Sequence, residues 1–292
     1  MEVAKSAQEA ERQLTEHATD DLVRNLGIPP RPQTLSDLQS EIASEDPDFR
    51  RIARLVASDV ALTAALLRIV NSPALALSRK CETLDQAVSM LGLRQINVMV
   101  TGLVLRKVLR CDGPQLTRFW DVSAKRAYAL GCMARELGGV EQDVAQTFGL
   151  FCDVGIPLLM RRFPDYATTL KACNEETVRS FTEVEEERHH TDHALIGGLM
   201  ARSWGISPVL CTAIRLHHDY AVFRDPKVPD VVLRLIAMGL IAEISIQRFA
   251  GLNISTEWNK GGDLAMGALM LSDQEVEDWI ERLLADYATG MA

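Results

Sequence analysis

Five of the six histidines lie between residues 189 and 218, and this clustering is the clearest sign of chemistry in the sequence. His217 and His218 end the segment PVLCTAIRLHH, whose apolar residues predict an amphipathic helix that turns His217 inward. His193 opens another helical segment, HALIGGLMARS, a short distance upstream. Imidazoles that meet on neighbouring helices are common ligands of divalent metals inside helical bundles.

Asp153 supplies a carboxylate for the same site. It stands in GLFCDVG, at the end of an apolar helical segment and between two glycines. An inward carboxylate beside inward imidazoles is typical of a metal centre, here formed by Asp153, His193, His217 and His218. The alternative is a structural polar cluster, in which the imidazoles bind backbone carbonyls and Asp153 without a metal.

The remaining three histidines are weaker candidates for a functional site. His189 and His190 adjoin the acidic run EVEEER, and we expect both to be solvated, as we do for His17. The whole stretch between 164 and 192 is polar and acidic, which indicates a mobile connection or a solvated helix.

The composition indicates an all-α globular protein. Of 292 residues, 47% are hydrophobic and only 5% aromatic, and alternating strand patterns are absent from the sequence. A net charge of −9 argues against a surface that follows nucleic-acid phosphates. The six cysteines form no C-x-x-C pair, which is typical of reduced thiols in a cytosol.

No segment predicts a targeting peptide or a membrane span. The first residues, MEVAKSAQEAERQ, are charged, and the longest apolar runs contain or adjoin arginine, lysine or glutamate. We therefore expect a cytoplasmic protein with neither a membrane nor a nucleic-acid partner.

Start and stop signals predict two packed helical lobes. The break CDGPQ separates an N-terminal lobe, residues 28–115, from a C-terminal lobe, residues 116–292. A polar helix or tail precedes both over residues 1–27. In the N-terminal lobe, Asp46-Pro47 is expected to start a helix, with the aspartate as N-cap and the proline as first helical residue.

Further signals place the other helices of the N-terminal lobe. Asp59 predicts a helix start, and Asn71 predicts its end, because asparagine tolerates left-handed geometry. Thr83 and Gln86 form a capping box for a short helix that ends at Gly92.

The order of several separated motifs resembles the HDOD family, bacterial signalling domains related to the HD superfamily of metal-dependent phosphohydrolases. The resemblance covers roughly residues 25–250 and implies an HD-like C-terminal lobe. The motifs that carry it are SDVALTAALLRIVNSP, ETLDQAVSMLGLRQI, FW, GLFCDVG, DHALIGGLMARSWGI and AIRLHH.

The resemblance assigns roles to particular residues. Asp153 and the three inward histidines would be a residual HD site in a cleft between the lobes, for Fe, Mn or Zn. The family's structural motif residues correspond here to Asn71, Ser72, Phe119, Trp120 and Gly197.

The sequence differs from the HD hydrolases at the histidine of their metal-binding His-Asp pair. HD hydrolases bind metal through an adjacent His-Asp pair, but here Cys152 precedes Asp153. Ile156-Pro157 stands where HD-GYP relatives carry a lysine, and DYAVFRDPKVP replaces their GYP loop. Cysteine is a soft ligand among imidazoles and a carboxylate, and it is also commonly just buried.

These features predict a non-enzymatic regulatory domain in bacterial signal transduction. It would act by protein–protein interaction with sensor, response-regulator or cyclic-nucleotide signalling proteins, and the sequence leaves its oligomeric state open. The alternative is a divergent metal-dependent phosphohydrolase or phosphodiesterase, with Cys152 in place of the lost histidine. A third hypothesis is a redox sensor that uses Cys152.

Overall fold

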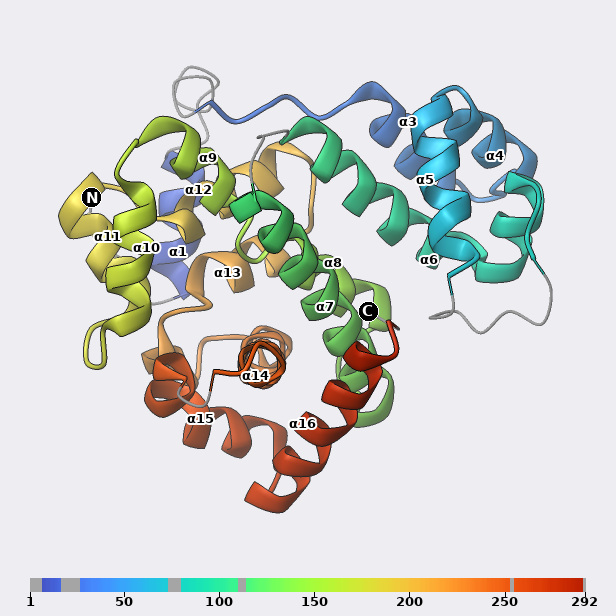
Figure 1. Cartoon of the computed structure of the whole chain (residues 1–292). Coiled ribbons are helices and arrows are strands. Elements are labelled where there is room, and N and C mark those ends of the chain that lie inside the picture. Colours follow the sequence, from blue (N-terminus) through green and yellow to red (C-terminus); the bar gives the residue numbers. More distant parts are fainter. Residues whose placement is uncertain (1–6, 17–26, 73–79, 110–113, 253–254, 291–292) are drawn as a thin grey trace. The chain divides into compact units, whose positions relative to one another are not determined.

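The computed structural model describes residues 7–16, 27–72, 80–109, 114–252 and 255–290, and these residues form helices with no strand among them (Figure 1). The predicted all-α class is confirmed. The chain divides into two compact units. One contains residues 30–110 and 286–292, and the other contains residues 1–29 and 111–285.

The unit of residues 30–110 is a small helical assembly in which α3, α4 and α5 pack against the longer α6. Its core consists of aliphatic side chains at helical spacing, such as Leu38, Ile52, Leu66 and Ile96, all fully buried. The bounds of its helices are α3 Gln33–Ile42, α4 Phe49–Ala57, α5 Val60–Val70 and α6 Leu84–Val108.

Two helix starts in this unit test the cap predictions. Asp59 caps α5 as predicted, since its carboxylate accepts a hydrogen bond from Leu62 N at 3.1 Å. The start at Asp46-Pro47 is wrong, because α4 begins two residues later. Asp48 is its N-cap and accepts from Arg50 N at 2.8 Å, while the Asp48 N–H donates to the Glu41 side chain.

Helix α6 begins and breaks as its sequence predicts. Thr83 and Gln86 form the reciprocal capping box at its start. Gly92 then interrupts the helix with φ of 77° and ψ of 165°, a conformation that a side chain would strain.

Asn71 ends α5, but not in the left-handed conformation that we predicted, since its φ is −89° and its ψ is 7°. Its amide instead bonds across the chain: Nδ2 donates to the carbonyls of Leu67 and Cys81, both at 2.8 Å, and Oδ1 accepts from Cys81 N at 2.7 Å. One side chain therefore ties the end of α5 to the segment that leads into α6. Pro73 lies outside the described residues, and Ser72 is partly exposed beside Asn71.

Replacement of Asn71 with Ala should lower the free energy of unfolding by about 2 kcal/mol, because this exposed residue makes three hydrogen bonds to backbone groups and all three are lost. The neighbouring Ser72→Ala should change it by less than about 0.5 kcal/mol. Urea titration followed by circular dichroism measures both. Equal stabilities of the two variants would show that the Asn71 bridge does not hold this unit together.

The larger unit is built around α7, which packs against α8 and α14, while α12 packs against α9 and α13 (Figure 1). Large side chains such as Phe148, Phe151 and Trp204 fill its core. Its helices are α7 Pro114–Leu137, α8 Gln142–Phe151, α9 Gly155–Arg162, α10 Tyr166–Glu175, α11 Phe181–His189, α12 His193–Ser203, α13 Pro208–Leu216, the 3-10 helix Tyr220–Arg224, α14 Asp230–Phe249, α15 Thr256–Leu269 and α16 Asp273–Ala288.

The expected mobile connection or solvated helix between 164 and 192 is wrong. The stretch forms α10 and α11, and Tyr166, Cys173 and Glu185 are fully buried in it. Helix α15 was not predicted, because its two adjacent glycines, Gly261 and Gly262, weaken the helical signal of its sequence.

The N-terminal helix α1 (Ala7–Glu16) belongs to the larger unit and packs against α12 and α13. Its buried Leu14 lies against Gly198, and Arg215 Nε donates to Gln13 Oε1 at 3.0 Å. Arg215 is itself buried and also bonds Asp192, the residue that caps α12.

Two helical stretches, Leu84–Val108 and Gln142–Arg162, are long and apolar enough to cross a membrane by these two criteria alone. Gly92 interrupts the first, and the second consists of α8 and α9, whose side chains pack in the larger unit. Buried core helices of other proteins satisfy the same two criteria, so these two stretches are weak evidence for a membrane span. The cytoplasmic location stays a prediction.

Candidate metal centre

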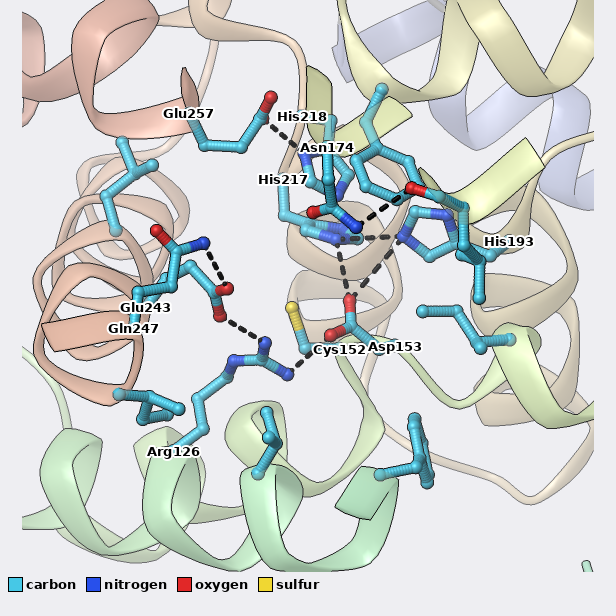
Figure 2. A pocket seen from close by; sticks show the side chains of 18 of the residues that line it. Arg126, Cys152, Asp153, Asn174, His193, His217, His218, Glu243, Gln247 and Glu257 are labelled. Atoms are coloured by element: carbon cyan, nitrogen blue, oxygen red, sulfur yellow. Dashed lines mark hydrogen bonds and ion pairs between the residues drawn. The ribbon is translucent and has the colours of Figure 1, made fainter. Parts of the chain in front are cut away.

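The structure brings Asp153 and the three inward histidines together, with one ligand atom of each within 4.8 Å of the others (Figure 2). Asp153 Oδ1 lies 3.2 Å from His217 Nε2 and 3.5 Å from His193 Nε2, and the two Nε2 atoms are 3.2 Å apart. All four residues belong to the larger unit. The expected position of the site in a cleft between the lobes stays a prediction.

Local sequence features explain how the helices meet here. A Cβ on Gly155 would lie 2.1 Å from the carbonyl oxygen of His193, so only glycine lets the start of α9 touch the start of α12. This contact carries Asp153, two residues before Gly155, to the imidazole of His193. Asp192 caps α12 by accepting from Leu195 N at 2.7 Å, which fixes His193 at the first helical position.

Each imidazole is oriented by an acceptor at its Nδ1. His193 Nδ1 lies 2.7 Å from Glu185 Oε2, and His218 Nδ1 lies 2.7 Å from Glu257 Oε2. His217 Nδ1 lies 2.7 Å from the Ile214 carbonyl oxygen. These acceptors retain a proton on Nδ1 and leave Nε2 to face the centre, which is the arrangement found in metal-binding histidines.

Glu185 is the most deeply placed of these supporting residues. Its side chain is fully buried on α11, accepts from the backbone N–H of His193 at 3.2 Å and also accepts from the Tyr166 hydroxyl. One carboxylate oxygen, Oε2, thus holds His193 by both its backbone N–H and its ring, while Oε1 accepts from the Tyr166 hydroxyl.

The pKa shifts show that the centre favours positive charge. Burial opposes the charged form of His193, yet Glu185 and Asp153 raise the pKa of His193 to about 10. Burial likewise opposes charge on His217, but Cys152 and Asp153 raise its pKa to about 9. Protons or a metal cation between these groups would supply that charge.

The pKa values of His218 and Asp153 are both lowered. Burial, together with the neighbouring His217, lowers the pKa of His218 to about 4, so it stays neutral. The pKa of Asp153 lies well below its usual range: burial opposes this shift, but the Arg126 guanidinium and the two imidazoles outweigh it. Asp153 is therefore an anion beside a neutral, ligand-ready His218.

The donor geometry fits a divalent metal. Ligands about 2.1 Å from a tetrahedral or octahedral ion are separated from one another by about 3.0 to 3.4 Å. The three distances among Asp153 Oδ1 and the two Nε2 atoms, 3.2 to 3.5 Å, are close to this spacing. A set of imidazoles and one carboxylate suits zinc, iron or manganese.

Arg126 pairs with one of the two carboxylate oxygens of Asp153. Its buried guanidinium lies 2.6 Å from Asp153 Oδ2 and 2.7 Å from Glu243 Oε2. Because Arg126 occupies the second carboxylate oxygen of Asp153, that residue has one oxygen left for an ion. Glu243 is held further by Gln247, whose Nε2 donates to it at 2.9 Å.

Cys152 is buried next to Asp153, but the converging ligand atoms found among the described residues do not include its sulfur. Its thiol interacts with His217 instead. The structure therefore gives no support to Cys152 as a substitute for the lost histidine ligand.

Sequence reasoning missed the supporting residues Arg126, Glu185, Glu243 and Glu257. Glu185 had a signal, since it follows Phe181 and Val184 at helical spacing on the buried face of α11, but the acidic run EVEEER hid it. Arg126, Glu243 and Glu257 can be identified as supporting residues only from their partners, which lie far away along the chain.

The remaining histidines are only partly as expected. His190 is exposed as predicted, and His17 lies outside the described residues. His189 as a solvated residue is wrong: it is buried, its Nε2 lies 2.8 Å from Thr169 Oγ1, and its ring lies against Phe163.

The other motif residues lie near the centre or in its supporting helices. Phe119 and Trp120 contact edge to face with ring centroids 4.9 Å apart, and Phe119 also lines the cavity over the histidines. A Cβ on Gly197 would lie 3.3 Å from Ile214, so this glycine allows close packing of α12 on α13.

Replacement of the buried Glu185 with Gln should weaken Zn²⁺ binding about 10- to 100-fold, because a carboxylate that orients a ligand imidazole is lost. The matched control is Glu187→Gln, an exposed position on the same helix. Competition with a chromophoric chelator measures the affinity, and circular dichroism verifies the fold. A folded Glu185→Gln variant with unchanged affinity would contradict the role of Glu185.

Comparison with known proteins adds a family match. The model of the HDOD domain matches residues 28–220, which include all four residues of the cluster. A Treponema pallidum protein of uncharacterised function is 26% identical over 254 residues, covering 83% of this chain and 47% of its own length. The chain thus spans about half of that relative.

Solved structures share the fold. A Shewanella amazonensis protein named as a candidate phosphohydrolase matches with a TM-score of 0.69 and 23% identity over 96% of both chains. A Marinobacter aquaeolei protein named as a candidate signal transduction protein matches with a TM-score of 0.74 and 19% identity, over 99% of this chain and 67% of its own. These likenesses confirm the predicted HD-like helical architecture.

Proposed function

The chain belongs to the HDOD domain family, and from this we propose that it is a regulatory domain of bacterial signal transduction that acts by binding other proteins. Its partners would be sensors, response regulators or cyclic-nucleotide signalling proteins. The centre of Asp153 and three histidines would hold one divalent metal, which would link the helices that carry these residues without supporting hydrolysis.

The observation that carries the proposal is the pairing of the carboxylates around the cluster. Asp153 and Glu243 share the Arg126 guanidinium, while Glu185 binds His193. Glu257 accepts from Lys260 at 2.7 Å and from the Tyr220 hydroxyl at 2.5 Å. Hydrolysis needs a general acid or base within reach of the substrate, and in the described part of the centre each of these groups already has a partner.

The alternative is a divergent metal-dependent phosphohydrolase. The convergent donor set supports it, because a metal held there would act as a Lewis acid toward a phosphoryl oxygen. The name of the Shewanella protein points the same way. The paired carboxylates, and the cysteine at the position where hydrolases carry a histidine ligand, argue against it.

Elemental analysis of protein purified without chelator should find about one Fe, Mn or Zn per chain, and Asp153→Ala should lose it, because the central oxygen ligand is removed. The metal-loaded protein should hydrolyse neither phosphomonoesters nor phosphodiesters above the background rate. Turnover at an enzyme-like rate that disappears in Asp153→Ala would overturn the regulatory proposal.

Replacement of Cys152 with His tests the alternative separately. If the centre is an impaired hydrolase, restoring the imidazole should raise metal content or phosphodiesterase activity. We expect neither to rise, because the Cys152 sulfur is not among the converging ligand atoms and Arg126 keeps the second oxygen of Asp153. Elemental analysis and a substrate panel measure both effects.

The protein-binding role needs its own test. The full chain, immobilised in the metal-loaded form, should retain two-component or cyclic-nucleotide signalling proteins from a bacterial lysate. Each captured protein should then bind the purified chain with a measurable affinity in calorimetry. Purified candidates from all three partner classes that show no binding would argue against this part of the proposal.

A further inference from the structure

A cavity of about 640 Å³ lies over the histidine cluster and is lined wholly by residues of the larger unit (Figure 2). This is far more space than a metal ion and its coordinated waters need, and it falls within the range of sites for small organic molecules. The cavity therefore raises the question of which molecule it accommodates.

Most of the lining is apolar and comes from several helices. Phe119 and Val122 of α7 and Ile156 and Met160 of α9 belong to it. The other large apolar lining residues include Leu170, Phe181, Ile236, Leu240, Ile246 and Leu252. Such walls favour an apolar molecular body, since its burial removes hydrocarbon surface from water.

The charges of the cavity are nearly all paired. Among its carboxylates, Asp153 and Glu243 bind Arg126, and Glu257 binds Lys260. Arg126, held between two carboxylates, is not free to receive an anion from outside. The deep part of the cavity therefore offers no unpaired cation among its described side chains.

Arg118 differs from these groups. It is exposed, lines the cavity from α7 two turns before Arg126, and makes no ion pair or side-chain hydrogen bond with the described residues. One exposed guanidinium without a partner among the described residues matches one anionic group. A nucleotide or polyphosphate carries several negative charges, and because the deeper cations are already paired with carboxylates, one rim guanidinium would leave most of that charge unmatched.

We propose that this cavity binds an apolar carboxylic acid, with the carboxylate paired to Arg118 at the rim and the hydrocarbon body between Phe119, Met160 and Leu170. The acid would be the small-molecule input of the domain. This inference goes beyond the proposed function and rests on the cavity and Arg118, so it holds whether or not a metal is bound.

Binding is tested with dansylundecanoic acid, a fluorescent apolar monoanion, on the full chain in metal-free and Zn²⁺-loaded forms. The probe should bind at about one per chain, and decanoate should displace it. Decanol, which has the same hydrocarbon chain without the charge, should compete at least fivefold more weakly, and ATP should not compete. Displacement by ATP at concentrations lower than decanoate would overturn the proposal.

Two pairs of variants locate the site. Ala167 is exposed on α10 and lines the cavity, whereas its exposed neighbour Thr168 does not. Ala167→Trp should block the opening and weaken probe binding at least tenfold, and Thr168→Trp should leave it unchanged. Arg118→Gln should remove most of the preference for decanoate over decanol, while Arg118→Lys retains most of it.

Each result decides the question. Unchanged binding in Ala167→Trp would place the probe elsewhere on the protein. An unchanged preference in Arg118→Gln would show that the rim guanidinium does not select the anion. Absence of probe binding in both metal states would exclude an apolar acid as the occupant. These assays measure neither metal content nor turnover, so a negative result would leave the proposed function to its own tests.

Discussion

The division of one partly buried carboxylate between two partners organises this molecule. Asp153 directs Oδ1 to the imidazoles of His193 and His217, and Oδ2 to the Arg126 guanidinium. A buried anion is costly unless it is paired and hydrogen-bonded, so every helix that supplies a partner is fixed relative to the α8–α9 turn. The same division leaves Oδ1 of Asp153 facing the two imidazoles.

Buried polar side chains around the centre hold its residues in place, and each of them is hydrogen-bonded to a further residue. Glu185 connects α11 to His193, and Tyr166 connects α10 to Glu185. On the opposite side, Arg215 joins α13 to the cap residue Asp192 and to Gln13 of α1. These contacts explain why the acidic stretch before His193 is folded: its charges satisfy the polar atoms that the centre buries.

The shared HD-like fold does not decide between binding and catalysis. Solved relatives below 25% identity carry names of both kinds, and a common helical scaffold supports different sites. The chemistry depends on the local groups: the guanidinium beside Asp153, the cysteine before it and the apolar walls above the histidines. The regulatory proposal therefore rests on these local groups and not on the shared fold.

The sequence by itself determined the all-α class, the caps at Asp59 and Thr83 and the break at Gly92, because periodicity and capping act over a few residues. The four converging residues were predicted from residue type, from the inward faces of their helices and from the family resemblance, and their convergence is a property of the tertiary structure. Only the tertiary structure decided the roles of Arg126, Glu185 and Glu257, and it corrected the start of α4 and the environment of His189. The physical reason is distance along the chain. Arg126 and Glu243 are 117 residues apart, and whether a charged residue is solvated or buried depends on a partner that local sequence does not contain.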